Sequence, residues 1–229
     1  MEESAVDLLR RWARQQVEFG YPDPIVTRGG AAEAEPAAGK GGLDAVREEL
    51  GDCARCPLHE RRTHLVFGDG DPRAGILFVG EAPGADEDRI GRPFVGRSGQ
   101  LLDKIFAAAG IRRDEVYITN VVKCRPPGNR DPEAEEIVTC LPFLMRQIEC
   151  VRPELICCLG RFAAQTLLQR PDPLGRLRGR WHDWEGMRLL CTYHPSACLR
   201  NPQYKRPVWE DFQMLRDAYR EIRPARPAE

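Results

Sequence analysis

Short apolar runs alternate with amphipathic segments along most of this sequence. Four runs of large apolar residues predict buried strands, at residues 76–79, 116–122, 155–159 and 188–193. Because these runs are apolar at consecutive positions, helices are expected to cover both faces of the sheet. The pattern therefore predicts an α/β fold, a three-layer α/β/α sandwich around a short, mostly parallel four-stranded sheet.

The segments between the strands carry helix signals. Ser98 is expected to cap the first helix, and Pro132 to be the first residue of the second, which Pro142 should kink. A third helix is expected after Gly160, and a last one from Pro207. The apolar stripe of this last helix consists of Val208, Phe212, Leu215 and Ile222.

The first 42 residues differ in composition from the rest of the chain. Residues 4–18 are expected to form an amphipathic helix, whereas residues 28–42 are rich in Gly and Ala, which is typical of a flexible linker. We therefore divide the chain into an N-terminal segment, residues 1–42, and a compact domain, residues 43–229. The N-terminal segment has two open interpretations, a docking segment for a replication partner or an inert extension.

Composition indicates the cellular setting. The N-terminus has no apolar core of a signal peptide, and no run reaches the roughly 18 apolar residues of a membrane span. Nine cysteines in such a chain indicate a reducing compartment, where they serve as thiols or metal ligands. These features predict a cytoplasmic protein without membrane contact, and the lack of a large exposed apolar stripe predicts a monomer.

Charge is informative only locally, because the formal net charge is −1. Residues 174–206 contain seven Lys or Arg and two acids, and Lys123, Arg125 and Arg130 form a second basic cluster. Separated charge of this kind can form a surface for phosphate groups on a nearly neutral protein.

Four of the cysteines stand in polar or Pro/Gly-rich surroundings. Cys53 and Cys56 form a C-x-x-C pair, Cys124 follows after 67 residues, and Cys140 after 15 more. Such a pair with two distant cysteines is typical of a four-thiolate metal site, either zinc or an iron–sulfur cluster. The other five comprise three expected core residues, Cys157, Cys158 and Cys191, and two without an assigned role, Cys150 and Cys198.

Distinctive side chains follow the predicted strands. The loop at residues 80–84 has glycines that allow a close approach to a ligand, although it also suits an ordinary turn. Asn120 can pair with the N3–H and O4 of a pyrimidine, or it can satisfy the backbone of a nearby loop. His194 can donate to an oxygen that gains negative charge, or it can be a structural residue.

Two further features concern flat ligands and DNA. Phe94, on a loop between Pro93 and Gly96, either packs in the core or forms a stacking platform for a base. Leu199 and Arg200 form an apolar and basic tip that suits insertion into a base stack beside a phosphate.

Taken together, these segments resemble the family 4 uracil-DNA glycosylases, the iron–sulfur members of the uracil-DNA glycosylase superfamily. The resemblance covers about residues 43–222. Its motifs are C-x-x-C at 53–56, GEAPGADED at 80–88, GRPFVGRSGQLL at 91–102, TNVVKCRPPGNR at 119–130, Cys140 and HPSACLR at 194–200. The resemblance implies DNA base-excision repair, in which uracil is flipped out of DNA and its N-glycosidic bond is hydrolysed, leaving an abasic site.

The resemblance also implies a role for each matching residue. A [4Fe–4S] cluster, rather than zinc, would be held by Cys53, Cys56, Cys124 and Cys140. The uracil pocket would be formed by the backbone of Gly80, Glu81 and Ala82, by Phe94 stacking on the base, by Asn120 on its pairing edge and by His194 at O2. The residues expected to contact DNA are Ser196, Leu199, Arg200, Lys123 and Arg125.

The implied mechanism needs a group that positions the attacking water. Family 1 enzymes place an Asp where this chain has Ala82, so Glu81 and Glu87 are the candidates, and Glu87 is preferred. After Cys124 the chain lacks the basic KRRIH insertion of the branch that traps uracil-DNA covalently, so repeated turnover is expected.

Two other classes of function remain open at this point. A metal-stapled nucleic-acid-binding module without catalysis would use the same cysteines and basic loops. A C-x-x-C redox protein fits less well, because the pair lacks the strand-then-helix placement of thioredoxin-like motifs.

Overall fold

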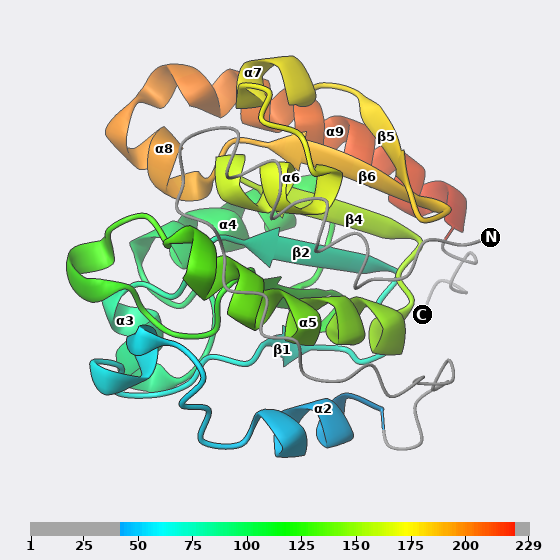
Figure 1. Ribbon diagram of the computed structural model, residues 1–229. Helices are drawn as coiled ribbons and strands as arrows, with labels where there is room; N and C mark the ends of the chain where they lie inside the picture. Colours follow the sequence, from blue (N-terminus) through cyan, green and yellow to red (C-terminus); the bar gives the residue numbers. More distant parts are fainter. Residues whose placement is uncertain (1–41, 223–229) are drawn as a thin grey trace.

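The computed structural model describes residues 42–222, and its centre is one twisted sheet (Figure 1). Within this range the sheet has six strands in the order β1-β3-β2-β4-β6-β5. Their bounds are β1 Asp69–Gly70, β2 Ile76–Gly80, β3 Tyr117–Asn120, β4 Leu155–Leu159, β5 Trp181–Trp184 and β6 Met187–Thr192. The four inner strands are parallel, and the edge strands β1 and β5 are antiparallel to their neighbours.

The four inner strands are the four predicted from the sequence, so the predicted sheet lacked two strands. β1 has only two residues, and β5 has the sequence WHDW, whose side chains are partly or fully exposed. Neither segment has the consecutive apolar residues of a strand buried on both faces, because each has only one neighbouring strand. The two strands that were not predicted lie at the edges of the sheet, and the α/β class is unchanged.

Helices cover both faces of the sheet, which gives three layers (Figure 1). One face packs against α5 and α6, through a core that includes Leu77, Ile156 and Leu144. The other face packs against α4 and α9, through Phe78 and Phe212. The helix bounds are α2 Gly42–Leu50, η1 Pro57–Glu60, α3 Ala85–Ile90, α4 Arg97–Ala109, η2 Arg113–Glu115, η3 Pro127–Asn129, α5 Ala134–Val151, α6 Arg161–Leu168, α7 Leu174–Leu177, α8 Pro195–Arg200, η4 Pro202–Tyr204 and α9 Lys205–Ile222.

Two predicted helix starts are wrong. α4 begins at Arg97 after Gly96, so Ser98 lies inside the helix and is not its cap. α5 begins at Ala134, where Glu133 and Glu136 form a reciprocal capping box. Pro132 therefore precedes the helix. The glutamates supply hydrogen-bond acceptors for the free N–H groups of the first turn, which proline cannot do.

Other features agree more closely with the sequence. α5 continues through Pro142 to Val151, and the predicted kink stays a prediction. α9 begins two residues before Pro207, and the first three members of its predicted stripe are buried. The expected core cysteines are buried, and so is Cys198, whereas Cys150 is partly exposed beside α2; the buried set is Cys157, Cys158, Cys191 and Cys198.

Some expectations fall outside the described range. The predicted helix at residues 4–18 lies there, as does all of the predicted linker except residue 42. The division of the chain at residues 42 and 43 therefore stays a prediction. Among residues 42–222, no helix is both long and apolar enough to cross a membrane.

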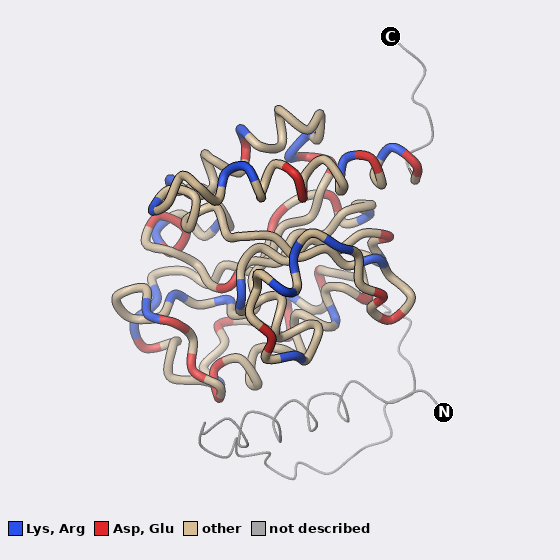
Figure 2. Tube along the Cα trace, turned by 90° about the horizontal axis from the view of Figure 1, so that it is seen from above, with Lys and Arg blue, Asp and Glu red and all other residues tan. Residues whose placement is uncertain are grey.

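Basic and acidic residues are interspersed along the trace (Figure 2), and many of them form ion pairs. In the basic stretch at 174–206, Arg178 pairs with the buried Asp211, Arg188 with Glu221, and Arg206 with Glu210. Part of this stretch is therefore neutralised within the fold, which leaves fewer free cations for phosphate groups than the sequence suggested.

Candidate active site

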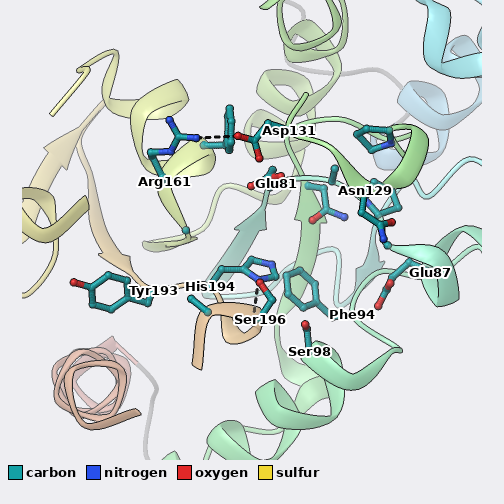
Figure 3. A pocket seen from close by; sticks show the side chains of 18 of the residues that line it. Glu81, Glu87, Phe94, Ser98, Asn129, Asp131, Arg161, Tyr193, His194 and Ser196 are labelled. Atoms are coloured by element: carbon teal, nitrogen blue, oxygen red, sulfur yellow. Dashed lines mark hydrogen bonds and ion pairs between the residues drawn. The ribbon is translucent and has the colours of Figure 1, made fainter. Parts of the chain in front are cut away.

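The carboxyl ends of the inner strands surround a cleft of about 500 Å³. Parallel strands bring the residues that follow them to one edge of the sheet, where α/β proteins bind their ligands. Figure 3 shows side chains from all four of these strand ends converging there. Residues predicted for the site that line this cleft are Glu81, Ala82, Glu87, Phe94, Asn120, His194, Ser196 and Arg200.

Gly80, at the end of β2, makes room for the floor of the cleft. It pairs with Asn120 across the parallel strands β2 and β3. A Cβ atom on Gly80 would lie 2.3 Å from Asn120 Oδ1 and 2.7 Å from Phe94 Cζ. Only glycine allows both side chains to approach the backbone at this point.

Asn120 presents an unused hydrogen-bond acceptor. Its side chain is buried, with 1% of the residue exposed, and Oδ1 has no hydrogen-bond partner within residues 42–222. A buried polar atom without a partner costs free energy, so such atoms concentrate where a ligand supplies the partner. Because Asn120 also lines the cleft, its Oδ1 is available to accept a hydrogen bond from a ligand that carries an N–H donor.

His194 caps α8 and is held in one tautomer. The backbone N–H of Ser196 donates to its Nδ1 over 3.1 Å, and Ser196 Oγ lies 2.8 Å from the same nitrogen. Since Nδ1 is the acceptor, the neutral ring carries its proton on Nε2. Burial and the nearby Arg200 lower the pKa of His194 to about 4. At neutral pH the ring is therefore an uncharged Nε2–H donor.

Phe94 stands beside this imidazole. Its ring centroid is 5.3 Å from that of His194, at 34° (Figure 3). The backbone of Phe94 has a φ of 51°, an uncommon conformation for a residue other than glycine. A Cβ on Gly99 would lie 1.8 Å from Phe94 O, so α4 packs directly against this loop. Phe94 thus belongs to the core and lines the cleft as well, and its role as a stacking platform for a base stays a prediction.

The two candidate glutamates differ in what they contact. Glu87 Oε1 accepts hydrogen bonds from the backbone of Val95 at 2.9 Å and of Gly96 at 2.8 Å, so its carboxylate holds the Phe94 loop. Glu81 lies nearer the centre of the cleft (Figure 3). Burial, together with the charge of Asp131, raises the pKa of Glu81 to about 7. A carboxyl group of this kind can exchange a proton near neutral pH.

The mouth of the cleft contains residues that the sequence analysis missed. Arg161, the first residue of α6, pairs with Asp131 at 3.1 Å (Figure 3), and Tyr193 lines the same cleft. Arg161 could have been found from its position in the sequence. Arg161 follows β4 and Gly160 directly, so it had to lie at the same sheet edge as Asn120 and His194.

The residues expected to contact DNA differ in their exposure. Leu199 is 40% exposed, and with Ile90 it is one of two large apolar side chains exposed in the described range. Arg125 is partly exposed, and its Nε donates to Asn129 Oδ1 over 2.8 Å. Lys123 is only 1% exposed, which does not support its expected contact with DNA. Lys123 instead lines the cavity that the four predicted cysteine ligands share.

A second, small cavity is lined by the four predicted ligands, Cys53, Cys56, Cys124 and Cys140, with Lys123, Leu50, Leu65, Thr139 and Phe143. Segments far apart in the sequence thus bring four thiols to one place. Cationic donors approach two of them, Arg55 at 3.3 Å from Cys53 Sγ and Arg62 at 3.3 Å from Cys124 Sγ.

The chemistry of these thiols suits a metal. Burial raises the pKa of Cys140 to about 11, so the metal-free group stays protonated, whereas a bound metal favours the thiolate. No three metal-ligating side chains in residues 42–222 are grouped as around a single ion. The four cysteines fit a group that takes four thiolate ligands and has neighbouring N–H donors.

A cleft at the strand ends, with a neutral imidazole, an unpaired amide oxygen and an aromatic ring, defines a pocket for a flat, hydrogen-bonding heterocycle. The chain belongs to the Uracil DNA glycosylase superfamily, whose family model matches residues 67–213. It is 45% identical over 181 residues to the type-4 uracil-DNA glycosylase of Archaeoglobus fulgidus, covering 76% of this chain and 91% of the relative.

Two further relatives are similar over the same region. The type-4 uracil-DNA glycosylase of Thermotoga maritima is 45% identical over 175 residues, 75% of this chain and 91% of the relative. That of Saccharolobus solfataricus is 43% identical over 185 residues, 77% of this chain and 86% of the relative. These matches confirm the family indicated by the motifs.

Proposed function

We propose that this protein removes uracil from DNA as the first step of base-excision repair. It hydrolyses the N-glycosidic bond of a flipped-out uracil and leaves an abasic site. The observation that carries the proposal is the unpaired Oδ1 of Asn120 in a cleft that also contains the neutral His194. The type-4 relatives, which are named uracil-DNA glycosylases, support the same conclusion.

Asn120 reads the pairing edge of the base. Its Oδ1 accepts from uracil N3–H, and its amide nitrogen donates to O4. Cytosine presents the reverse pattern, with an acceptor at N3 and a donor at C4, and would leave the buried Oδ1 without a donor. Phe94 provides the flat surface on which the base stacks.

His194 and the backbone N–H groups of the β2 loop stabilise the leaving group. Bond cleavage places negative charge on uracil, and an Nε2–H donor in a partly dehydrated cleft stabilises that charge as it forms. The neutral imidazole acts as a hydrogen-bond donor and keeps its proton throughout the step. The low pKa of His194, caused by burial and by Arg200, keeps the ring in this state.

Glu81 is the better candidate to orient and deprotonate the attacking water, although Glu87 was preferred from the sequence. Glu87 Oε1 is occupied by two backbone N–H groups of the Phe94 loop. Within the described residues, the carboxyl group of Glu81 does not hold a loop in this way. Its pKa near 7 suits a general base. Glu87 then acts on the reaction indirectly, by holding Phe94.

The rim of the cleft contacts DNA. Leu199 enters the space left by the flipped nucleotide, because it is apolar and exposed on α8. Arg125, Arg161 and Arg200 contact phosphates, which adds affinity without sequence preference. Ser196 stabilises this surface by its hydrogen bonds to His194 Nδ1.

A [4Fe–4S] cluster is the cofactor that fits the four cysteines. Cys53, Cys56, Cys124 and Cys140 would hold it as thiolates, with the guanidinium groups of Arg55 and Arg62 beside the sulfurs. When bound, it supplies four covalent links between loops that are distant in sequence, and it stabilises them in the way a structural metal does.

The remaining expectations concern the cell. We propose that the protein acts as a monomer in the cytoplasm, on single- or double-stranded DNA that contains uracil. Contact of residues 1–42 with a replication partner remains the alternative to an inert extension.

Alkaline cleavage of a labelled oligonucleotide with one uracil tests the proposal, using protein purified without oxygen. We expect strand scission at uracil, more than one turnover per enzyme, and no scission of matched oligonucleotides with thymine or hypoxanthine. His194→Ala should lower the rate about 100-fold or more, while DNA binding persists. Binding of all three oligonucleotides without any scission would favour a binding module instead.

A further inference from the structure

Lys123 lies between the cysteine cavity and the base pocket. It is 1% exposed and lines the cavity formed by the four cysteines. On its other side, Nζ donates to Thr119 Oγ1 over 2.8 Å and to the backbone oxygen of Asn120 over 2.5 Å. One side chain therefore contacts both the proposed cluster site and the residue proposed to read the base.

The charge of Lys123 needs a counter-charge. An ammonium group carries three donors, and Thr119 and Asn120 use two of them. Among residues 42–222, the hydrogen-bond acceptors of the buried Nζ are these two neutral oxygens, and a buried charge without compensation is costly. The cavity that Lys123 lines also contains the Sγ-bearing side chains of Cys140 and Cys124. Thiolates that hold a cluster would supply the missing negative charge.

The contact with Asn120 bears on base recognition. Asn120 is the last residue of β3, and the next backbone N–H, of Val121, donates to Gly80 O over 2.9 Å. Its carbonyl accepts from Lys123 on the cluster side. The backbone that places the unpaired Oδ1 is thus held from two directions, and one of them depends on Lys123.

We propose that Lys123 is a positioning residue that couples the cysteine cluster to base recognition. Its charge balances the cluster thiolates, and its remaining N–H groups hold Asn120 in the geometry that accepts uracil. The inference rests on the proposed function, because it takes the cluster and the uracil pocket as its two ends. Loss of the cluster would leave Lys123 uncompensated and release Asn120.

The test compares Lys123→Met with Arg62→Met in the full chain. Both changes remove a cation beside the cysteines, but only Lys123 contacts Asn120, since Arg62 donates to Cys124 Sγ, Cys53 O and Asp52. For each variant, one measures the rate at which an iron chelator bleaches the visible absorbance of the cluster, and the inhibition constant of free uracil.

We expect both variants to lose iron about tenfold faster than the unaltered protein. Only Lys123→Met should weaken inhibition by uracil, by about tenfold, measured on the fraction that retains the cluster. Unchanged uracil inhibition in Lys123→Met would overturn the coupling, and so would an equal weakening in both variants. Melting curves establish that each variant is folded.

A second measurement needs no substitution. Coupling between two sites is reciprocal, so an oligonucleotide with a non-cleavable uracil nucleotide should slow iron loss more than the same oligonucleotide with thymine. Equal rates would also overturn the proposal. Failure of the proposed function would look different, since the unaltered protein would then contain no iron or would not release uracil.

Discussion

At the scale of single residues, the pocket depends on how two polar side chains, Asn120 and His194, are paired within residues 42–222. Asn120 Oδ1 is buried and unpaired, and His194 Nδ1 is occupied so that Nε2 keeps the proton. Groups whose hydrogen-bonding state is fixed before a ligand binds lower the cost of binding and of transition-state stabilisation.

Replacing Asn120 with Asp tests the pairing edge. The carboxylate keeps an acceptor but loses the N–H donor for O4, and its charge repels the uracil anion. We expect kcat/KM for uracil excision to fall at least about 100-fold, with little change in affinity for DNA without uracil. Single-turnover kinetics and a DNA-binding titration measure the two quantities. A fall in both would indicate a general loss of structure.

Glu81 predicts a pH dependence. Its pKa is raised from 4.5 to about 7 by burial, so between these values the folded protein binds a proton that the unfolded chain has released. The free energy of unfolding should therefore fall as pH rises through this window, and Glu81→Gln should flatten that slope. Urea unfolding at several pH values measures it.

The same carboxyl group should set the rate profile. If ionised Glu81 activates water, the single-turnover rate rises as pH passes about 7, and Glu81→Gln removes this rise. Glu87→Gln serves as the comparison, and it should keep the rise because Glu87 holds the Phe94 loop. A rise that persists in Glu81→Gln would assign the water to another group.

At the scale of elements, the site is built from the ends of parallel strands. The order of the inner strands could not be read from the sequence, but the rule that their carboxyl ends share an edge already placed Asn120 and His194 together. The edge strands were missed because β1 is two residues long and β5 lacks an apolar run. The starts of two helices were also predicted wrongly. α4 begins at Arg97, one residue before the predicted cap Ser98, and α5 begins at Ala134, two residues after Pro132.

Gly80→Ala tests the contact between strands β2 and β3. The added Cβ would lie 2.3 Å from Asn120 Oδ1, so Asn120 or the strand must shift, at a cost of about 1–3 kcal/mol of stability. We expect uracil excision to fall steeply. Gly175→Ala in α7 is the matched control, because its Cβ would meet only Tyr193 Oη, at 3.8 Å. Equal activity in the two variants would contradict the role of Gly80.

At the scale of the whole molecule, a nearly neutral protein must bind a polyanion at one edge. Several arginines are paired internally, so we expect the phosphate contacts to come from the residues around the cleft rather than from the net charge. The exposed Leu199 is the side chain that we propose to fill the space left by the flipped base.

Leu199→Ala should separate double-stranded from single-stranded substrates. A wedge matters only where a base must be extracted from a stack, so we expect excision to slow about tenfold or more in a U·A duplex. Excision from a single strand should change little. Rates on the two substrates, measured side by side, decide the point, and an equal loss on both would argue against a wedge.

The sequence by itself determined the α/β class and the four inner strands, and it singled out the four cysteines that share a cavity and most of the predicted residues that line the cleft. These depend on local patterns and on motifs, which are encoded over a few consecutive residues. Only the tertiary structure decided that Lys123 is buried, that Glu87 holds a loop, that Glu81 has a raised pKa, and that Asn120 Oδ1 is unpaired. Burial and hydrogen bonding depend on contacts between distant segments, so they exist only once the chain has folded.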